Sequence, residues 1–365
     1  MYIPNVINPQ ITNQDSKFES IIGIGNPMID FSTHLEKDDI KNFNLSFGET
    51  VFCDEQNKSL IDNIDKCSIL NKIPGGSIMN TLRVCSWCLN KNQNTNNNYI
   101  ITMLGAIGDD DLKEKIINSL EKTKVVPLLQ IIPREKSSTC GIIVNNKEKC
   151  LVPDIQASKH LSKEFITQNI NIIFNHDILL IESYYLKENY KICKYLCEEF
   201  KRQNKLVILT VNAIIVKNYL KEVIEIANMC DIIYGNFLSI KLLANSIDSP
   251  LKQIFEKVHQ ILSPKNRLLL VNGGNNHGVY CSKYDYQNNK LDLNMQCFPI
   301  NIKNEEIKDF IGDGPAFLGG FLSMFLKGNT SIQQLGSCCK IGHTAANEIL
   351  KNTGCTFPEK CNIKC

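Results

Sequence analysis

The sequence predicts an α/β fold with a mainly parallel, doubly wound sheet and a small β-rich lid. Short apolar runs alternate with amphipathic helical segments along most of the chain, which is typical of a sheet covered by helices. Two strand-rich stretches depart from this alternation, and we assign them to the lid. A chain of 365 residues, 43% of them hydrophobic, is long enough for one large domain with a substantial core.

The chain begins with a polar leader, residues 1–20, and the first apolar run follows at residues 21–25. Further continuous apolar runs of strand length fit a parallel sheet that is buried on both faces. These runs lie at residues 100–104, 178–181, 206–211, 231–234 and 268–271. The strand-rich lid segments extend over about 31–74 and 136–158.

Helical spacing of apolar residues appears between these runs and after them. The predicted helices lie at residues 79–85, 111–122, 188–202, 217–229, 249–262, 315–326 and 332–350. The asparagine-rich stretch 90–98 has low complexity and predicts an exposed loop. A short tail follows at 361–365.

The composition argues against several classes of function. With 40 basic and 38 acidic residues, the net charge of +2 does not predict a nucleic-acid groove or a membrane-surface patch. No apolar run approaches the roughly 20 residues of a membrane span, and the polar leader lacks the apolar core of a secretory signal. We therefore expect a soluble, intracellular protein in the cytoplasm.

The sixteen cysteines are scattered rather than grouped. Cys85 and Cys88 form the one C-x-x-C, on a predicted helix, with no second pair at zinc-ligand spacing. We expect buried thiols here and no metal site.

Several motifs follow one another in a defined order. They are Gly25–Asp30 (GNPMID), Gly75–Ser77 with Asn80, Gly105–Asp110 (GAIGDD), Gly235-Asn236, Asp309–Phe321 (DFIGDGPAFLGGF), Gly342-His343 and Gly354–Lys360 (GCTFPEK). In this order and spacing they resemble the motifs of adenosine kinases, within the ribokinase-like (pfkB) carbohydrate kinases, over nearly the whole chain. The resemblance implies a ribokinase-like three-layer α/β/α core over residues 21–360, with the lid inserted in it.

The resemblance also implies a ribose site between core and lid. Asp30 would accept hydrogen bonds from a vicinal diol, because a carboxylate offers two oxygens to two hydroxyls. Gly75 and Gly76 would allow close approach to the sugar and act as a hinge. The remaining substrate-binding residues implied by the resemblance are Asn26, Ser77, Asn80, Tyr184 and Tyr185. Without the family resemblance, Asp30 could cap a turn and the two glycines could form an ordinary loop.

The phosphate half of the pattern departs from the family. Pro315 stands where the family has its catalytic aspartate, so no base is present there and one backbone N–H is missing. The family's anion-hole turn corresponds to Gly312, Asp313 and Gly314, in which Asp313 places a negative charge beside the expected phosphate. Phe310 replaces the usual threonine of the motif. The resemblance therefore implies a site without an intact catalytic residue.

The nucleotide-binding residues implied by the resemblance are equally degenerate. Asn236 keeps the first position of the family's N-x-x-E motif, but Ser239 replaces the glutamate that organises magnesium, and a hydroxyl is a poor ligand for that ion. Gly273 is the third nucleotide-binding residue that the resemblance implies. Mg and ATP are implied as cofactors if the protein is active, and no cofactor otherwise.

The predicted function is an adenosine-kinase-like protein that is catalytically impaired but retains a nucleoside pocket, with a binding or structural role. Two alternatives stay open at this point. One is an active adenosine kinase that converts ATP and adenosine to ADP and AMP, and the other is a purely structural subunit of a larger assembly. Adenosine or a similar nucleoside is the expected small-molecule partner, and protein partners, including a cytoskeletal or other large assembly, are expected in the structural case.

Overall fold

A computed structural model describes residues 18–62, 64, 69–90, 99–145, 148–263, 265–274, 278–285, 290–297, 302–331 and 334–363. Most of the predicted polar leader, residues 91–98 of the predicted asparagine-rich loop and the last two residues of the predicted tail lie outside these ranges.

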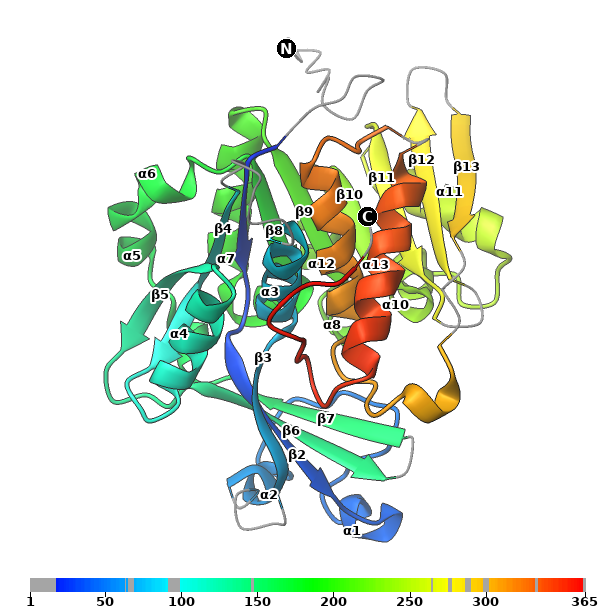
Figure 1. Cartoon of the computed structure of the whole chain (residues 1–365). Coiled ribbons are helices and arrows are strands. Elements are labelled where there is room, and N and C mark those ends of the chain that lie inside the picture. The colour runs from blue at the N-terminus through cyan, green and yellow to red at the C-terminus, as the bar shows by residue number, and fades with distance from the viewer. Residues whose placement is uncertain are drawn as a thin grey trace.

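A nine-stranded sheet forms the centre of the large domain (Figure 1). Its strands lie in the order β13 (Lys290–Cys297), β12 (Val279–Asp285), β11 (Arg267–Asn272), β10 (Ile232–Asn236), β9 (Leu206–Val211), β8 (Ile178–Glu182), β1 (Ser20–Ile24), β4 (Ile100–Gly108) and β5 (Val126–Ile132). All neighbouring pairs are parallel except β11–β12 and β12–β13. Strand β1 lies between β8 and β4. The strands β4 and β5 are added on one side of β1, and the strands from β8 onward are added on its other side.

Helices cover both faces of this sheet because successive strand residues point to opposite sides. In β8, for example, Ile178 and Leu180 belong to one buried cluster, and Leu179 and Ile181 belong to the other. The first cluster includes side chains of α3 (Ser77–Leu89), α4 (Lys113–Lys122), α12 (Asp313–Leu326) and α13 (Leu335–Leu350). The second includes side chains of α5 (Lys163–Gln168), α6 (Ile170–Ile173), α7 (Ser183–Arg202), α8 (Ala213–Asn218), α9 (Leu220–Met229), α10 (Phe237–Leu243) and α11 (Leu251–Ile261).

A separate four-stranded sheet lies below the large one in Figure 1. Its order is β3 (Ile69–Gly75), β2 (Met28–His34), β6 (Ser138–Asn145) and β7 (Glu148–Asp154). The segment 48–53 runs along β7, where the N–H groups of Val51 and Cys53 donate to the carbonyls of Leu151 and Pro153 at 2.9 Å each. Short helices complete this region and the connections: α1 (Lys37–Lys41), α2 (Lys58–Asp62) and the 3₁₀ turns Ala157–His160 and Asn304–Glu306.

This architecture confirms the predicted fold class of a mainly parallel sheet between helices and a smaller β-rich sheet. Some elements differ from the sequence prediction. The helix predicted at 217–229 is two helices, because the backbone at Tyr219 leaves helical geometry (φ −136°, ψ 40°). Helix α7 begins at Ser183, five residues earlier than predicted, and Asn189 interrupts its geometry while its amide donates to the Ser158 carbonyl at 3.1 Å. The exact boundaries of the lid, about residues 31–74 and 136–158, stay a prediction.

Candidate functional site

Two neighbouring cavities open where the parallel strands of the large sheet end, the place where sheets of this kind bind ligands. The sheet-interface cavity, about 240 Å³, lies between the two sheets and is lined by Asn26, Met28, Asp30, Thr50, Phe52, Gly76, Ser77, Asn80, Cys140, Ile142, Lys149, Leu151, Pro153, Ile155, Glu182, Tyr184, Asn212, Ile311, Gly312, Asp313 and Pro315. The strand-end cavity, about 250 Å³, is lined by Ser77, Thr81, Thr210, Val211, Asn212, Tyr234, Gly235, Asn236, Asn272, Gly274, Asp313, Gly314, Pro315 and Leu318.

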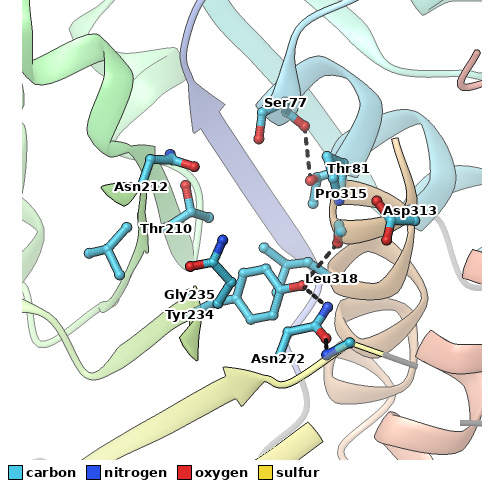
Figure 2. Close-up of a pocket in the computed structure, with 14 residues that line it drawn as sticks. Ser77, Thr81, Thr210, Asn212, Tyr234, Gly235, Asn272, Asp313, Pro315 and Leu318 are labelled. Carbon is cyan, nitrogen blue, oxygen red and sulfur yellow. Dashed lines mark hydrogen bonds between the residues drawn. The ribbon is translucent and has the colours of Figure 1, made fainter. Parts of the chain in front are cut away.

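Four residues line both cavities, so the two spaces meet at a junction. These junction residues are Ser77, Asn212, Asp313 and Pro315. They come from the first turn of α3, the end of β9 and the first turn of α12. Figure 2 shows Asn212 and Pro315 on opposite sides of the strand-end cavity, with Ser77 between them at the top.

Asp30 is one of three acidic residues that line the sheet-interface cavity, with Glu182 and Asp313. Burial is the main cause that raises the pKa of the Asp30 carboxyl to about 7. The positive charge of Arg83 lowers this pKa, the negative charge of Asp309 raises it further, and Lys149 has a smaller lowering effect. Gly75 on the adjacent strand β3 lies so close that a Cβ there would be 2.1 Å from the Asp30 Oδ2. Asp30 is thus held in a tight backbone groove and faces the cavity with a carboxyl that ionises near neutral pH.

Aromatic side chains form another wall of the same cavity. The Tyr184 ring meets the Phe52 ring edge-on, with centroids 6.0 Å apart and an interplanar angle of 79°. Burial raises the pKa of the Tyr184 hydroxyl to about 12, while a hydrogen bond with Thr50 lowers it. The lining of the cavity therefore combines aromatic ring surface with polar groups, as expected for a ligand that carries both a ring and hydroxyls.

Pro315 occupies the third position of α12. Gly312 precedes the helix with φ +83°, a left-handed conformation that favours glycine, and its carbonyl accepts the Ala316 N–H at 2.9 Å. A residue at the third helical position has no carbonyl partner within the helix, so the missing N–H of proline costs the helix no hydrogen bond. Proline at this position therefore costs α12 nothing, and it offers the junction neither a backbone N–H donor nor a side-chain proton acceptor.

Asp313 and Tyr234 shape the wall of the strand-end cavity beside Pro315. The Tyr234 hydroxyl donates to the Gly314 carbonyl at 3.2 Å and accepts from the Asn272 amide at 3.2 Å (Figure 2). Burial is the main cause that holds the pKa of Tyr234 well above its usual range; the Asn272 hydrogen bond lowers that pKa and the charge of Asp313 raises it. The first turn of α12 therefore presents a carboxylate to this cavity.

The predicted nucleotide residues serve local structure. The Asn236 side chain caps α10 by accepting from the Ser239 backbone N–H at 2.8 Å and from its hydroxyl at 2.7 Å. Ser239 is fully buried in that cap. Gly273 donates its N–H to the Gly278 carbonyl at 2.7 Å in the turn after β11.

Most of the predicted site residues come together around the two cavities. The predicted residues that line one or both are Asn26, Asp30, Gly76, Ser77, Asn80, Tyr184, Asn236, Gly312, Asp313, Gly314 and Pro315. Four other predicted residues line neither cavity: Gly75, Tyr185, Ser239 and Gly273. Gly75 packs against Asp30, and Tyr185 is buried in the hydrophobic cluster on the α7 face of the sheet. Ser239 and Gly273 form the local hydrogen bonds described above. Of the two predicted tyrosines, Tyr184 alone faces the cavity.

Among the polar residues that line the cavities and that sequence reasoning missed are Glu182, Thr210 and Asn212. Each lies at or directly after the end of a parallel strand, β8 or β9. Polar residues at strand ends meet at one edge of a parallel sheet, so this position was the signal that could have identified them.

We expect Gly76→Ala to destabilise the protein by on the order of 1–3 kcal/mol and by more than Gly48→Ala, because alanine disfavours this backbone conformation and its Cβ would also clash with the backbone at Gly76. Gly76 has φ +97°, and a Cβ at this position would lie 2.2 Å from the Asn26 carbonyl oxygen. Gly48→Ala is a matched control, since Gly48 has φ +91° and a Cβ added there would have no atom within 4 Å. Chemical denaturation of both variants measures the difference, and equal losses of stability would show that the contact with Asn26 does not matter.

The described residues contain no membrane-spanning helix, because no helix among them has the necessary length and apolar character. Within the same ranges, no group of three or more His, Cys, Asp or Glu side chains is placed to hold a metal ion. The two cysteines of the C-x-x-C are buried in α3, and burial holds the pKa of the Cys85 thiol well above its usual range.

Known proteins resemble this chain over most of its length. The profile of the pfkB family of carbohydrate kinases matches residues 41–361. Adenosine kinase from Dictyostelium discoideum is 25% identical over 346 residues, which cover 93% of this chain and 96% of that protein. Adenosine kinase 2 from Arabidopsis thaliana is 23% identical over 359 residues, with coverages of 93% and 96%.

Solved structures resemble it in fold. Anopheles gambiae adenosine kinase in complex with P1,P4-di(adenosine-5) tetraphosphate superposes with a TM-score of 0.81 at 19% identity, covering 94% of this chain and 99% of that one. Schistosoma mansoni adenosine kinase in complex with 2-fluoroadenosine gives a TM-score of 0.81 at 20% identity, with coverages of 94% and 98%.

Proposed function

Because the chain belongs to the pfkB family of carbohydrate kinases, we propose that it binds adenosine or a similar nucleoside but transfers phosphate poorly or not at all. One observation carries the proposal: Pro315 lines both cavities at their junction, where the base for the transfer is needed. Phosphoryl transfer requires a group that accepts the proton of the attacking hydroxyl, and proline has none.

The sheet-interface cavity suits a nucleoside. Asp30 offers two carboxylate oxygens to a vicinal diol, and Asn26 and Asn80, each 4% exposed, add buried polar groups beside it. Tyr184 and Phe52 supply ring surface for a base. Adenosine kinases are among the relatives, and one solved neighbour holds 2-fluoroadenosine, which supports a nucleoside as the ligand class.

The strand-end cavity fits ATP and Mg²⁺ poorly. Asp313 lines it with a negative charge, and Pro315 lacks the N–H that could stabilise a phosphate oxygen. Ser239, in the position expected to organise magnesium, is buried and hydrogen-bonded to Asn236. We therefore propose a binding or regulatory role.

Calorimetry and a turnover assay test this proposal together. We expect measurable binding of adenosine, weak or undetectable binding of Mg-ATP, and adenosine-dependent ADP formation at least about 100-fold below the 1–100 s⁻¹ typical of kinases. Tight Mg-ATP binding with turnover in that ordinary range would instead establish an active adenosine kinase. Absence of adenosine binding would overturn the proposal and favour a purely structural subunit.

A further inference from the structure

Glu182 is a buried carboxyl group at the point where the sheet changes its direction of winding. It ends β8, and the preceding residue, Ile181, is in register with Ile24 at the end of β1. The side chain is 2% exposed and lines the sheet-interface cavity. The crevice between two such strands is where doubly wound sheets bind ligands.

Hydrogen bonds place Glu182 at the junction of the two cavities. Its carboxylate accepts from the Ser77 hydroxyl and from the Asn26 backbone N–H. The next residue, Ser183, accepts the Asn212 backbone N–H at 2.9 Å on its hydroxyl. Ser77 and Asn212 both line the two cavities; Glu182 is hydrogen-bonded to the first, and its neighbour Ser183 is hydrogen-bonded to the second.

One oxygen of this carboxyl group, Oε2, is buried without a hydrogen-bond partner. Burial raises the pKa of Glu182 to about 7, the two hydrogen bonds lower it, and among the described residues no cation is a cause of the shift. Buried acceptors in native proteins are nearly always paired, and an exception calls for an explanation. A donor on a bound ligand would supply the missing partner.

The cations that line or border the cavity have other partners. The Lys149 ammonium donates to the Phe310 carbonyl at 2.7 Å. The Arg83 guanidinium donates to Asn80 Oδ1 at 3.0 Å and to the Cys355 carbonyl at 3.3 Å. At the junction, Asp313 contributes a further carboxylate. A phosphate ester carries a charge of about −1.5 to −2 at neutral pH, so two acidic groups would repel it here.

We propose that Glu182 makes the junction selective for a free hydroxyl and excludes the phosphorylated form of the same ligand. This inference rests on the proposed nucleoside-binding function. With the vicinal diol on Asp30, the remaining ribose hydroxyl, at the 5′ position, is the donor available to Glu182. The protein then takes adenosine rather than AMP, and Glu182 is a specificity-determining residue.

Calorimetry with three probes tests the proposal on the full chain at pH 8, where Glu182 is mostly ionised. The probes are adenosine, 5′-deoxyadenosine and AMP. A hydrogen bond to a charged group typically accounts for about 10- to 100-fold in affinity. We therefore expect the wild-type protein to bind 5′-deoxyadenosine and AMP at least about 10-fold more weakly than adenosine.

Glu182→Gln is expected to reduce both preferences, because the neutral amide accepts a weaker hydrogen bond and no longer repels phosphate. Glu188→Gln is the matched control: this carboxylate lies on α7, the helix that follows Glu182, pairs with Lys187 at 2.7 Å and is 36% exposed. The control variant should keep the wild-type preferences. Thermal unfolding of each variant verifies that it is folded, and the 5′-deoxyadenosine comparison on the wild type needs no variant.

Each outcome bears on one of the two proposals. Equal affinities of the wild type for adenosine and 5′-deoxyadenosine, or preferences unchanged in Glu182→Gln, overturn the role of Glu182 and leave nucleoside binding intact. No detectable binding of adenosine overturns the proposed function and this inference with it.

Discussion

Replacing Pro315 by aspartate is expected to raise the rate of adenosine phosphorylation by about 10²-fold or more, the usual contribution of a general base. The substitution supplies a carboxylate at the junction of the two cavities and restores a backbone N–H in the first turn of α12. The fold should tolerate it, because an acidic side chain in the first turn of a helix interacts favourably with the helix dipole. Adenosine-dependent formation of ADP measures the effect.

Pro315→Ala is the matched control for this experiment. It also restores the N–H but supplies no proton acceptor, so it should leave the rate within a few-fold of the wild type. If the alanine and aspartate variants gained equally, the missing N–H rather than the missing base would be the defect. If neither gained, the acidic wall at Asp313 would be the next barrier, and Asp313→Ala combined with Pro315→Asp would separate the two effects.

Asp30→Asn is expected to weaken adenosine binding by about 100-fold, because a charged acceptor of two hydroxyls contributes about 1.5–3 kcal/mol per hydrogen bond. Asp30 lines the sheet-interface cavity and packs closely against Gly75. Calorimetry measures the loss. Asp38→Asn is the control, since that carboxylate is exposed on α1 and pairs with Lys41 at 2.8 Å. Unchanged affinity in Asp30→Asn would place the ligand elsewhere.

The affinity should also depend on pH in a defined direction. The pKa of Asp30 is raised to about 7 by burial, with Arg83 lowering it, Asp309 raising it and Lys149 lowering it. The ionised form accepts from both hydroxyls, so affinity for adenosine should rise by up to about 10-fold between pH 6 and pH 8 as that form becomes populated.

The effect on folding has the opposite sign. An acid with a raised folded-state pKa stabilises the fold below its unfolded pKa, near 4, and this contribution is lost as the pH rises through 7. Asp30→Asn should therefore be at least as stable as the wild type at pH 8, which distinguishes lost binding from lost folding. Thermal unfolding at pH 5 and pH 8 measures this difference.

The fold class and the main strands followed from the sequence because buried parallel strands are continuous apolar runs. The runs at residues 178–181 and 206–211 are β8 and β9, almost residue for residue. The hairpin β12–β13 was missed because its residues, such as Lys290–Cys297 (KLDLNMQC), mix polar and apolar types at an edge of the sheet. The break between α8 and α9 was missed because apolar spacing continues across Tyr219.

The sequence by itself determined the fold class of this chain and predicts that Pro315 stands at the family's aspartate position, since residue identity and motif order are local properties. Only the tertiary structure decided which side chains meet around a cavity. Tyr184 and Tyr185 are neighbours in sequence, yet the first faces the cavity and the second the core. Glu182 carries no motif, and its place beside Ser77 and Asn26 arises because β8 and β1, more than 150 residues apart in the chain, pair in the sheet.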